Sequence, residues 1–253
     1  MGMDTFACSI LRRFLLQKLE SHASSHEPIQ IASLGYQDII CASQMYELWF
    51  GEGAIDKLTM RPNTDRLLAI HGRNAAGVEI VPTMESFLEL FGNVKVDVID
   101  FQKYQGTEIV CDLGKAIPEK LENKYDIVID GGTIEHVFNI AQAFHNITKM
   151  LKVGGLVYHV LPINMINHGF YNISPTLLYD YYGDARFSFE YFKMVHTIHG
   201  NGQVRWHEEN PPHTGRFQLK EERGVHLVAK RQNATQEMCY PIQAKYRYKE
   251  TWR

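Results

Sequence analysis

The sequence lacks any apolar run that approaches the roughly twenty residues of a membrane span. Its first residues also lack the order of a signal peptide, in which a basic start precedes an apolar stretch and small residues. The 4 cysteines are scattered without a Cys-x-x-Cys pair, which indicates free thiols in a reducing compartment rather than a disulfide framework or a zinc site. We therefore expect a cytoplasmic protein without a membrane partner.

The sequence also lacks an excess of positive charge. Its 26 lysines and arginines stand against 29 acidic residues, for a formal net charge of −3. This balance gives no electrostatic footprint for duplex nucleic acid, so it argues against a nucleic-acid partner and favours a small molecule. The 253 residues can bury the core of one large α/β domain, and they contain no internal repeat. We therefore expect residues 1–253 to form a single domain.

The pattern from Tyr125 to Pro162 predicts a strand, a helix and a second strand. The first and last segments are apolar runs typical of strands buried on both faces, and the middle segment has apolar residues at helical spacing. Gly154 and Gly155 follow the helix as a stop signal. Such βαβ units are right-handed and parallel, and ligands bind beyond the carboxyl ends of their strands. The three elements are expected over residues 125–129, 137–150 and 156–161.

The string YDIVIDGGTIEHVF beginning at Tyr125, followed after a helix by MLKVGGLVYHVLP, resembles the central part of a class I S-adenosylmethionine-dependent methyltransferase. In that family an acidic or polar residue ends the fourth strand, a Glu-His pair often follows, and a Leu-Lys-x-Gly-Gly turn leads into the fifth strand. The resemblance covers residues 29–162 and names no substrate. It implies an α/β, Rossmann-like three-layer sandwich, with a mostly parallel seven-stranded sheet closed by a C-terminal antiparallel hairpin.

Three segments lie outside that common frame. The connection between the first strand, 29–34, and the second, 94–99, is longer than one crossover helix needs, so we predict an inserted helical cap over residues 43–92. Residues 6–20 read as an amphipathic lead-in helix that packs on the domain or covers its active site, with a membrane-surface role as the alternative. The aromatic and basic tail, 232–253, is expected to pack across the domain or onto another subunit of a homo-oligomer.

The resemblance implies S-adenosylmethionine as cofactor, and the turn after the first strand would approach its methionyl part. The family usually has two or three glycines there, because close approach of the backbone leaves no room for a Cβ. This sequence has Gly35 followed by Tyr36, Gln37 and Asp38. Either the loop takes a different path, with Gln37 or Asp38 contacting the amino or carboxylate group of the cofactor, or the pocket is degenerate.

Acidic residues end the next strands. Asp100 ends the second strand, where the resemblance implies hydrogen bonds to the ribose hydroxyls. Asp112 follows the third strand, and the resemblance implies that it binds the exocyclic amine of adenine while the Leu113 amide meets a ring nitrogen. A lone aspartate at a strand end is commonly a turn residue or a helix cap, but the succession favours a nucleoside site. Asp130 and Gly131, after the fourth strand, complete the expected cofactor contacts.

The acceptor side needs a group that can take up a proton. Methyl transfer is an in-line displacement, and an oxygen or nitrogen acceptor also loses a proton. His136 and His168 are the candidate bases because histidine titrates near neutral pH, and Glu135 is placed to orient one of them or to contact the substrate. The alternative for His136 is a helix-start residue bonded to the backbone, and we expect His159 to be a core histidine. The predicted acceptor-binding residues beyond the fifth strand are Asn164, Asn167 and Tyr171.

A metal ion is a variant that the sequence does not require. Some members of the resembled family bind a divalent ion through Glu-x-x-Glu-His, but here Gly132 stands in place of the first glutamate. His168 could complete a site with Glu135 and His136, yet nothing in the spacing demands it. We therefore predict no metal.

Three functions remain open. The first is an S-adenosylmethionine-dependent methyltransferase acting at oxygen or nitrogen of a small molecule, such as a sugar or a secondary metabolite. The second is a nicotinamide-dependent oxidoreductase, which Asp100 would also suit, although the required Gly-x-Gly-x-x-Gly is missing and Asp112 would have no role. The third is a non-catalytic, methyltransferase-like binding or scaffold subunit, for which the glycine-poor turn is the evidence.

Overall fold

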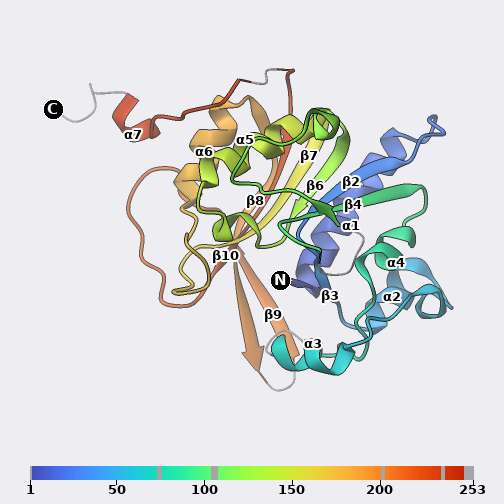
Figure 1. Cartoon of the computed structure of the whole chain (residues 1–253). Helices are drawn as coiled ribbons and strands as arrows, with labels where there is room; N and C mark the ends of the chain where they lie inside the picture. The colour runs from blue at the N-terminus through green and yellow to red at the C-terminus, as the bar shows by residue number, and fades with distance from the viewer. Residues whose placement is uncertain (1, 73–75, 104–107, 201–202, 235–236, 248–253) are drawn as a thin grey trace. The chain divides into compact units, whose positions relative to one another are not determined.

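The structure, a computed structural model, describes residues 2–72, 76–103, 108–200, 203–234 and 237–247. The chain divides into two compact units. Unit 1 comprises residues 1–111 and 197–206, and unit 2 comprises residues 112–196 and 207–253. Each unit contains strands and helices, so the fold is mixed α/β (Figure 1). No helix in the described part of the chain is long and apolar enough to cross a membrane.

Unit 1 is built on three parallel strands. They are β2 (Ile29–Leu34), β4 (Val94–Asp100) and β5 (Ile109–Val110). β4 pairs with both of the others and lies between them. Leu34 stands opposite Ile99, so β2 and β4 end at the same edge. The apolar side chains of β2 are buried on both faces, as expected of a parallel strand covered by other elements.

A second sheet in unit 1 has two short strands that the sequence analysis did not predict. β1 (Gly2–Asp4) pairs in parallel with β3 (Asp38–Ile40). Each strand has three residues, which is too short for alternation of apolar and polar positions to be detected. The turn that follows β2 therefore leads directly into another strand.

Helix α1 (Thr5–Ser21) lies where a lead-in helix was expected over residues 6–20. Asp4 caps it, because the carboxylate accepts a hydrogen bond from the Ala7 amide at 2.8 Å. Trp206, in the same unit, donates from Nε1 to the other Asp4 oxygen at 3.2 Å and stacks on Phe6. The apolar stripe of α1 is buried, so the helix packs on the protein: Ala7, Cys8, Ile10, Leu11, Phe14 and Leu15.

The region predicted as an inserted cap is largely helical. Its elements are α2 (Gln44–Phe50), the 3₁₀ turn η1 (Ile55–Lys57), α3 (Thr64–Ile70) and α4 (Met84–Glu89). In the sequence, Thr83 is a candidate helix cap. In the structure it caps α4 by accepting a hydrogen bond from the Ser86 amide. Leu67 of α3 packs in a small cluster with Ile40, Val78 and Val81. That this region shapes a ligand site stays a prediction.

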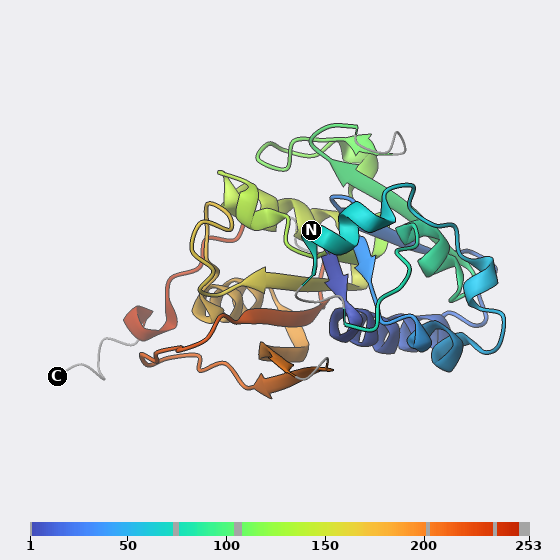
Figure 2. The ribbon, with the colours of Figure 1, turned by 90° about the horizontal axis from the view of Figure 1, so that it is seen from below.

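Unit 2 has a mixed sheet. Its strands include β6 (Tyr125–Asp130), β7 (Leu151–Pro162), β10 (Gly224–Arg231) and residues 187–196 of β8 (Phe187–Gly200). β6 and β7 are parallel, whereas β10 runs antiparallel to both β7 and β8 and lies between them. Figure 2 shows β7 and β10 side by side. The sequence over residues 188–196 and 225–231 predicts two strands for the C-terminal antiparallel hairpin. Both strands are present, and they pair antiparallel.

The segment between those strands differs from its prediction. Residues 200–215 are rich in glycine, asparagine, proline and histidine, a composition that predicts a mobile loop. That prediction is wrong for β9 (Gln203–Glu209), a strand beside β8. Its residues are mostly polar and alternate between exposed and half-buried, so an apolar pattern could not reveal it. The expectation of seven strands consequently omits β1, β3 and β9.

The described part of unit 2 contains both 3₁₀ turns and α-helices. They are the 3₁₀ turns η2 (Glu119–Leu121) and η3 (Ile134–His136), and the α-helices α5 (Ile140–Met150), α6 (Pro175–Asp184) and α7 (Ala244–Arg247). α5 joins β6 to β7, which completes the predicted βαβ unit. Ser174 followed by Pro175 is a sequence pattern typical of a helix start, and α6 begins there with Pro175 in its first turn.

Gly154 and Gly155 have a different role from the predicted helix stop. They lie inside β7, where the register with β6 shifts between Tyr125 and Ile127. Gly154 has φ of 79°, a conformation that favours glycine. A Cβ on Gly155 would lie 2.9 Å from the Lys152 carbonyl oxygen. The pair therefore permits a bulge in the strand.

The described part of the C-terminal tail packs on its own unit. The Ala244 amide donates a hydrogen bond to Asp180 of α6 at 3.1 Å. Arg247 pairs with Asp184 at the end of the same helix, with Nη1 to Oδ1 at 2.6 Å. This is one of the two packings expected of the tail, whose residues 248–253 lie outside the described part of the chain.

Candidate functional site

Gly35 forms the turn at the end of β2. Its φ is 70°, which a residue with a Cβ rarely adopts. The Gly35 amide donates to the Ile99 carbonyl at 2.8 Å, and the Ser33 hydroxyl donates to the Gly35 carbonyl at 2.8 Å. The hydroxyl of the next residue, Tyr36, donates a hydrogen bond to the Glu85 carboxylate at 2.6 Å. One glycine therefore suffices to turn this backbone.

Gln37 and Asp38 have internal partners. Gln37 is fully buried and donates from Nε2 to the Leu34 carbonyl at 2.8 Å, while its Oε1 has no hydrogen-bond partner among the described residues. The Asp38 carboxylate pairs with Arg61 at 3.0 Å and with His71 at 3.1 Å. Both side chains therefore serve the interior of unit 1 in this structure. Their expected contacts to a cofactor stay a prediction.

Asp100 ends β4 at the edge where β2 also ends. Its backbone carbonyl accepts a hydrogen bond from Cys111 at 2.8 Å, which fixes the end of β5 beside it. The side chain is half-buried, and it accepts a long hydrogen bond of 3.4 Å from the Gln102 amide. Because Leu34 and Ile99 are in register, Asp100 and Gly35 follow neighbouring strand ends. This is the arrangement expected for a ribose-binding carboxylate beside a glycine turn.

Asp112 and Leu113 begin unit 2. Asp112 accepts a hydrogen bond from the Gly114 amide at 2.9 Å and pairs with Lys115 at 3.1 Å. The Gly114 hydrogen bond and the neighbouring Lys115 lower the pKa of the Asp112 carboxyl. Leu113 is buried, and its carbonyl accepts a hydrogen bond from Asn146 at 2.9 Å. Asp112 thus closes its own turn, and the adenine contacts of both residues stay a prediction.

Asp130 lies in a buried hydrogen-bond chain. One carboxylate oxygen accepts from the Thr133 and Ile134 amides at 3.0 and 3.3 Å, which fixes the start of η3. The other lies 2.6 Å from His159 Nδ1, and His159 Nε2 lies 2.5 Å from the Tyr182 hydroxyl. His159 is therefore a satisfied core histidine, as expected. Asp130 and the adjacent Gly131 are buried, so Asp130 positions the η3 turn, and their cofactor contacts stay a prediction.

Glu135, His136 and His168 come together in unit 2. Glu135 Oε1 lies 3.3 Å from His168 Nε2 and 3.8 Å from His136 Nε2. One ligand atom from each of the three lies within 4.8 Å of the others. The Glu135 side chain is 0% exposed, whereas those of His136 and His168 are 44% and 45% exposed. The structure thus brings together the three predicted catalytic residues, with the carboxylate beneath two solvent-facing imidazoles.

The Glu135 carboxyl is in an unusual electrostatic environment. Neither of its oxygens has a hydrogen-bond partner among the described residues. Burial, with a smaller contribution from the nearby Asp130 charge, raises the pKa of Glu135 to about 8. Burial and the adjacent His168 lower the pKa of His136. A positive charge beside Glu135 would favour the ionised form of its carboxyl and so lower this pKa.

The position of His168 depends on the backbone that follows it. The Phe170 and Tyr171 amides both donate to the Glu135 carbonyl, at 2.9 and 3.2 Å. Between them and His168 lies Gly169, and a Cβ there would come within 2.9 Å of Glu135 Cγ and of its carbonyl oxygen. The absence of a side chain at Gly169 therefore lets this segment lie directly against Glu135.

The predicted acceptor-binding residues have structural partners around this cluster. Asn164 donates to the Glu221 carbonyl at 2.9 Å and accepts from the Arg223 amide at 2.8 Å. Asn167 has φ of 61°, which suits the turn before His168. The Tyr171 hydroxyl donates to the Phe138 carbonyl at 2.8 Å. Substrate contacts for these residues stay a prediction.

An exposed aromatic pair near the cluster was missed by the sequence analysis. Phe138 and Phe170 are 78% and 67% exposed, and their rings meet edge to face at 5.9 Å. The helix predicted over residues 137–150 includes Phe138, but α5 begins only at Ile140. Two exposed aromatic rings next to a polar cluster suit a small molecule with an apolar face.

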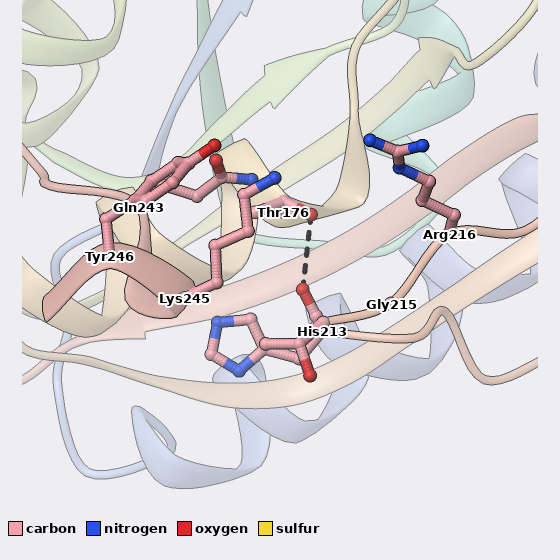
Figure 3. A pocket seen from close by; sticks show the side chains of 8 residues that line it. Thr176, His213, Gly215, Arg216, Gln243, Lys245 and Tyr246 are labelled. Carbon is pink, nitrogen blue, oxygen red and sulfur yellow. Dashed lines mark hydrogen bonds between the residues drawn. The ribbon is translucent and has the colours of Figure 1, made fainter. Parts of the chain in front are cut away.

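Unit 2 also contains a cavity that no sequence pattern indicated. Its volume is about 810 Å³, and Figure 3 shows the side chains that line it. The Thr176 hydroxyl donates to the His213 carbonyl at 3.2 Å across one wall. Arg216 and Lys245 bring positive charge to the lining. The cavity is formed by α6, the loop before β10 and α7, and its lining includes none of Glu135, His136 and His168.

Comparison with known proteins gives no family by sequence. No protein-family model matches the chain, and no curated protein matches it. Three similar solved structures span most of the chain at low identity. They are 1,6-didemethyltoxoflavin-N1-methyltransferase from Burkholderia thailandensis (12% identity, TM-score 0.43, 86% of this chain and 78% of that one), TehB from Haemophilus influenzae (10%, 0.39, 85% and 62%) and a SAM-dependent methyltransferase from Methanosarcina mazei (10%, 0.36, 84% and 97%). Similarity at these scores carries no argument about activity.

Proposed function

We propose that the protein is an S-adenosylmethionine-dependent methyltransferase that acts at oxygen or nitrogen of a small molecule, such as a sugar or a secondary metabolite. The observation that carries the proposal is the pairing of a left-handed Gly35 with the half-buried Asp100 carboxylate at neighbouring parallel strand ends. A nucleoside cofactor with an extended amino-acid arm needs both features, a backbone that it can approach closely and an acceptor for its ribose hydroxyls.

The residues of unit 1 fit the cofactor at these two positions. Asp100 would accept hydrogen bonds from the ribose, and the Gly35 backbone would lie against the methionyl arm. Gln37 Oε1, a buried acceptor without a donor among the described residues, would suit the amino group if the turn opened. The bound cofactor would supply an electrophilic methyl group on a sulfonium.

The residues of unit 2 fit the acceptor side. His136 and His168 are half-exposed, so an acceptor hydroxyl or amine can reach either ring nitrogen. Either imidazole would then take up the proton that the acceptor loses, and Glu135 would stabilise the imidazolium that forms. The exposed rings of Phe138 and Phe170 would cover the apolar part of the acceptor. We also propose that the acceptor is a small molecule rather than a nucleic acid, because the net charge is −3.

The first test is calorimetric titration of the purified chain with S-adenosylhomocysteine, with NAD as the control ligand. We expect micromolar binding of S-adenosylhomocysteine alone. Asp100→Ala should weaken it about tenfold to a hundredfold, on the scale of lost charge-assisted hydrogen bonds. Asp97→Ala, a half-buried aspartate on the same strand but away from its carboxyl end, should leave the affinity unchanged.

The outcomes of this titration distinguish the three candidate functions. Binding of NAD instead would support an oxidoreductase. If neither ligand bound a folded protein, the scaffold hypothesis would replace the enzyme hypothesis. Equal affinities in the wild-type and Asp100→Ala proteins would remove the ribose assignment.

A further inference from the structure

We propose that Glu135, His136 and His168 form a binding site for a divalent first-row transition-metal cation, such as Zn²⁺, Mn²⁺ or Co²⁺. The donor set is one carboxylate oxygen and two imidazole nitrogens. The sequence allows this set without requiring it, and the structure brings one ligand atom from each of the three residues within 4.8 Å of the others. The site does not depend on the proposed methyltransferase activity and can be tested without it.

The Glu135 carboxylate is buried and lacks hydrogen-bond donors among the described residues. Its side chain is 0% exposed, and neither oxygen accepts a hydrogen bond from the described residues. A buried carboxylate without a donor is costly, and proteins compensate such a group by pairing it or by coordinating a metal. Glu135 Oε1 lies 3.3 Å from His168 Nε2 and 3.8 Å from His136 Nε2. A cation between the three would compensate the carboxylate.

The donor atoms of the three side chains are spaced almost as the ligands of one metal ion would be. Metal–ligand bonds to histidine nitrogen and carboxylate oxygen are about 2.0–2.2 Å, so two ligands of one tetrahedral ion lie about 3.4 Å apart. The observed separations from Glu135 Oε1 bracket that value. The two imidazole rings face the same region, with centroids 5.4 Å apart. Only small side-chain shifts would be needed to bind an ion.

The site is fixed by backbone hydrogen bonds on the Glu135 side and is open to solvent on the histidine side. The Glu135 backbone is held by the Phe170 and Tyr171 amides, and the η3 turn that carries it is fixed by Asp130. His136 and His168 are nearly half-exposed, which leaves solvent access to the side of the ion away from Glu135. Three protein ligands with an open position are typical of catalytic rather than structural metal sites.

The consequence for catalysis rests on the proposed function. An acceptor oxygen bound at the open position would lose its proton more readily, because a divalent cation lowers the pKa of a bound hydroxyl. The histidines would then hold the ion instead of taking up the proton themselves, and that proton would pass to solvent water at the exposed face of the site. In the proposed reaction the methyl group would still pass directly from sulfur to the acceptor oxygen.

The test is binding of metal by the purified full-length chain. Protein stripped with EDTA and dialysed would be titrated with ZnCl₂ by calorimetry, and with CoCl₂ while the visible absorption of Co²⁺ is followed. We expect one ion per chain and Co²⁺ bands typical of four or five ligands. Glu135→Gln and His168→Gln should each weaken Zn²⁺ binding by on the order of a hundredfold.

His207→Gln is the matched control. His207 is 55% exposed and lies 3.0 Å from Glu209, so it is also a solvent-facing histidine beside a glutamate, but no third ligand completes a cluster there among the described residues. Its replacement should leave Zn²⁺ affinity unchanged. Absence of binding by folded wild-type protein, or equal affinity in Glu135→Gln, His168→Gln and wild type, would overturn the site. Titration of the metal-free protein with S-adenosylhomocysteine separates this failure from a failure of the proposed function.

Discussion

His226 is a buried imidazole that unit 2 keeps uncharged. It is 5% exposed, and its Nδ1 lies 2.9 Å from the Tyr158 hydroxyl on the adjacent strand β7. Burial lowers the pKa of His226 to about 3. In the unfolded chain the same side chain would titrate near its ordinary value of about 6.5. The difference couples folding to pH.

The direction of the coupling follows from which state binds the proton. Below about pH 6.5, His226 binds a proton in the unfolded chain but stays neutral in the folded chain. The free energy of unfolding therefore falls as the pH decreases. Between pH 7 and pH 5, His226 alone should remove about 2 kcal/mol of unfolding free energy. Urea unfolding at both pH values checks this. His226→Gln should flatten the pH dependence by that amount, and an unchanged slope would contradict the assignment.

The same scale explains why individual cofactor contacts were hard to predict. Asp38, Asp100, Asp112 and Asp130 all lie at or near strand ends, and in the sequence they look alike. In the structure Asp38 and Asp130 have buried partners, Arg61 for one and His159 for the other, while Asp100 is half-buried. Whether a carboxylate turns inward depends on a partner distant in sequence. A local pattern cannot contain that information.

At the scale of elements, the segment after β7 decides whether His168 reaches Glu135. Gly169 is its critical residue, because an added Cβ would collide with Glu135 Cγ and with backbone. Gly169→Ala should push the segment away, weaken Zn²⁺ binding at least about tenfold, and cost about 1–3 kcal/mol of stability. Zinc calorimetry and thermal unfolding measure the two effects.

Gly183 supplies the control for that substitution. It is an exposed residue of α6, and nothing lies within 4 Å of the position a Cβ would take. Gly183→Ala should leave Zn²⁺ affinity unchanged and stabilise the protein by up to about 1 kcal/mol, because alanine favours a helix. If both alanine variants bound zinc like the wild type, close backbone approach at Gly169 would not be what positions His168.

Elements with a strong apolar period were predictable, and those shaped by pairing were not. The buried strand β6 and helix α5 follow from their sequence pattern, as does the capping of α4 by Thr83. The sequence indicates that Glu135 and His136 can meet His168, because these residues follow the ends of the parallel strands β6 and β7. Strands β1 and β3 could not be predicted because they have three residues each, and β9 because it is mostly polar. All three strands depend on pairing with strands elsewhere in the chain.

At the scale of the whole molecule, each unit contains one part of the predicted α/β arrangement. Unit 1 has the parallel strands β5, β4 and β2 in that order, and unit 2 has β6, β7, β10 and β8 with β10 antiparallel. The class of fold was therefore predictable from the alternation of strands and helices. The packing of side chains within each unit was not, because it depends on contacts between distant residues.

The cysteines offer a measure of that packing. All four are free, as predicted. Cys8, Cys41 and Cys111 are buried in unit 1, whereas Cys239 in unit 2 is half-buried. Burial and the neighbouring Cys41 raise the pKa of the Cys8 thiol well above its usual range, and burial also raises the pKa of Cys239. Since the thiolate is the reactive form, both effects slow modification of the native protein.

We therefore expect Ellman's reagent to label one thiol per native chain, slowly, and all four in denaturant. Cys239→Ser should abolish the native labelling. As urea is raised, the three thiols of unit 1 should become reactive in one step, because they share one unit, and the midpoint of that step reports its unfolding. Prompt labelling of two or more thiols in native Cys239→Ser protein would show that the interior of unit 1 is open to solvent, contrary to the packing of α1 and β3.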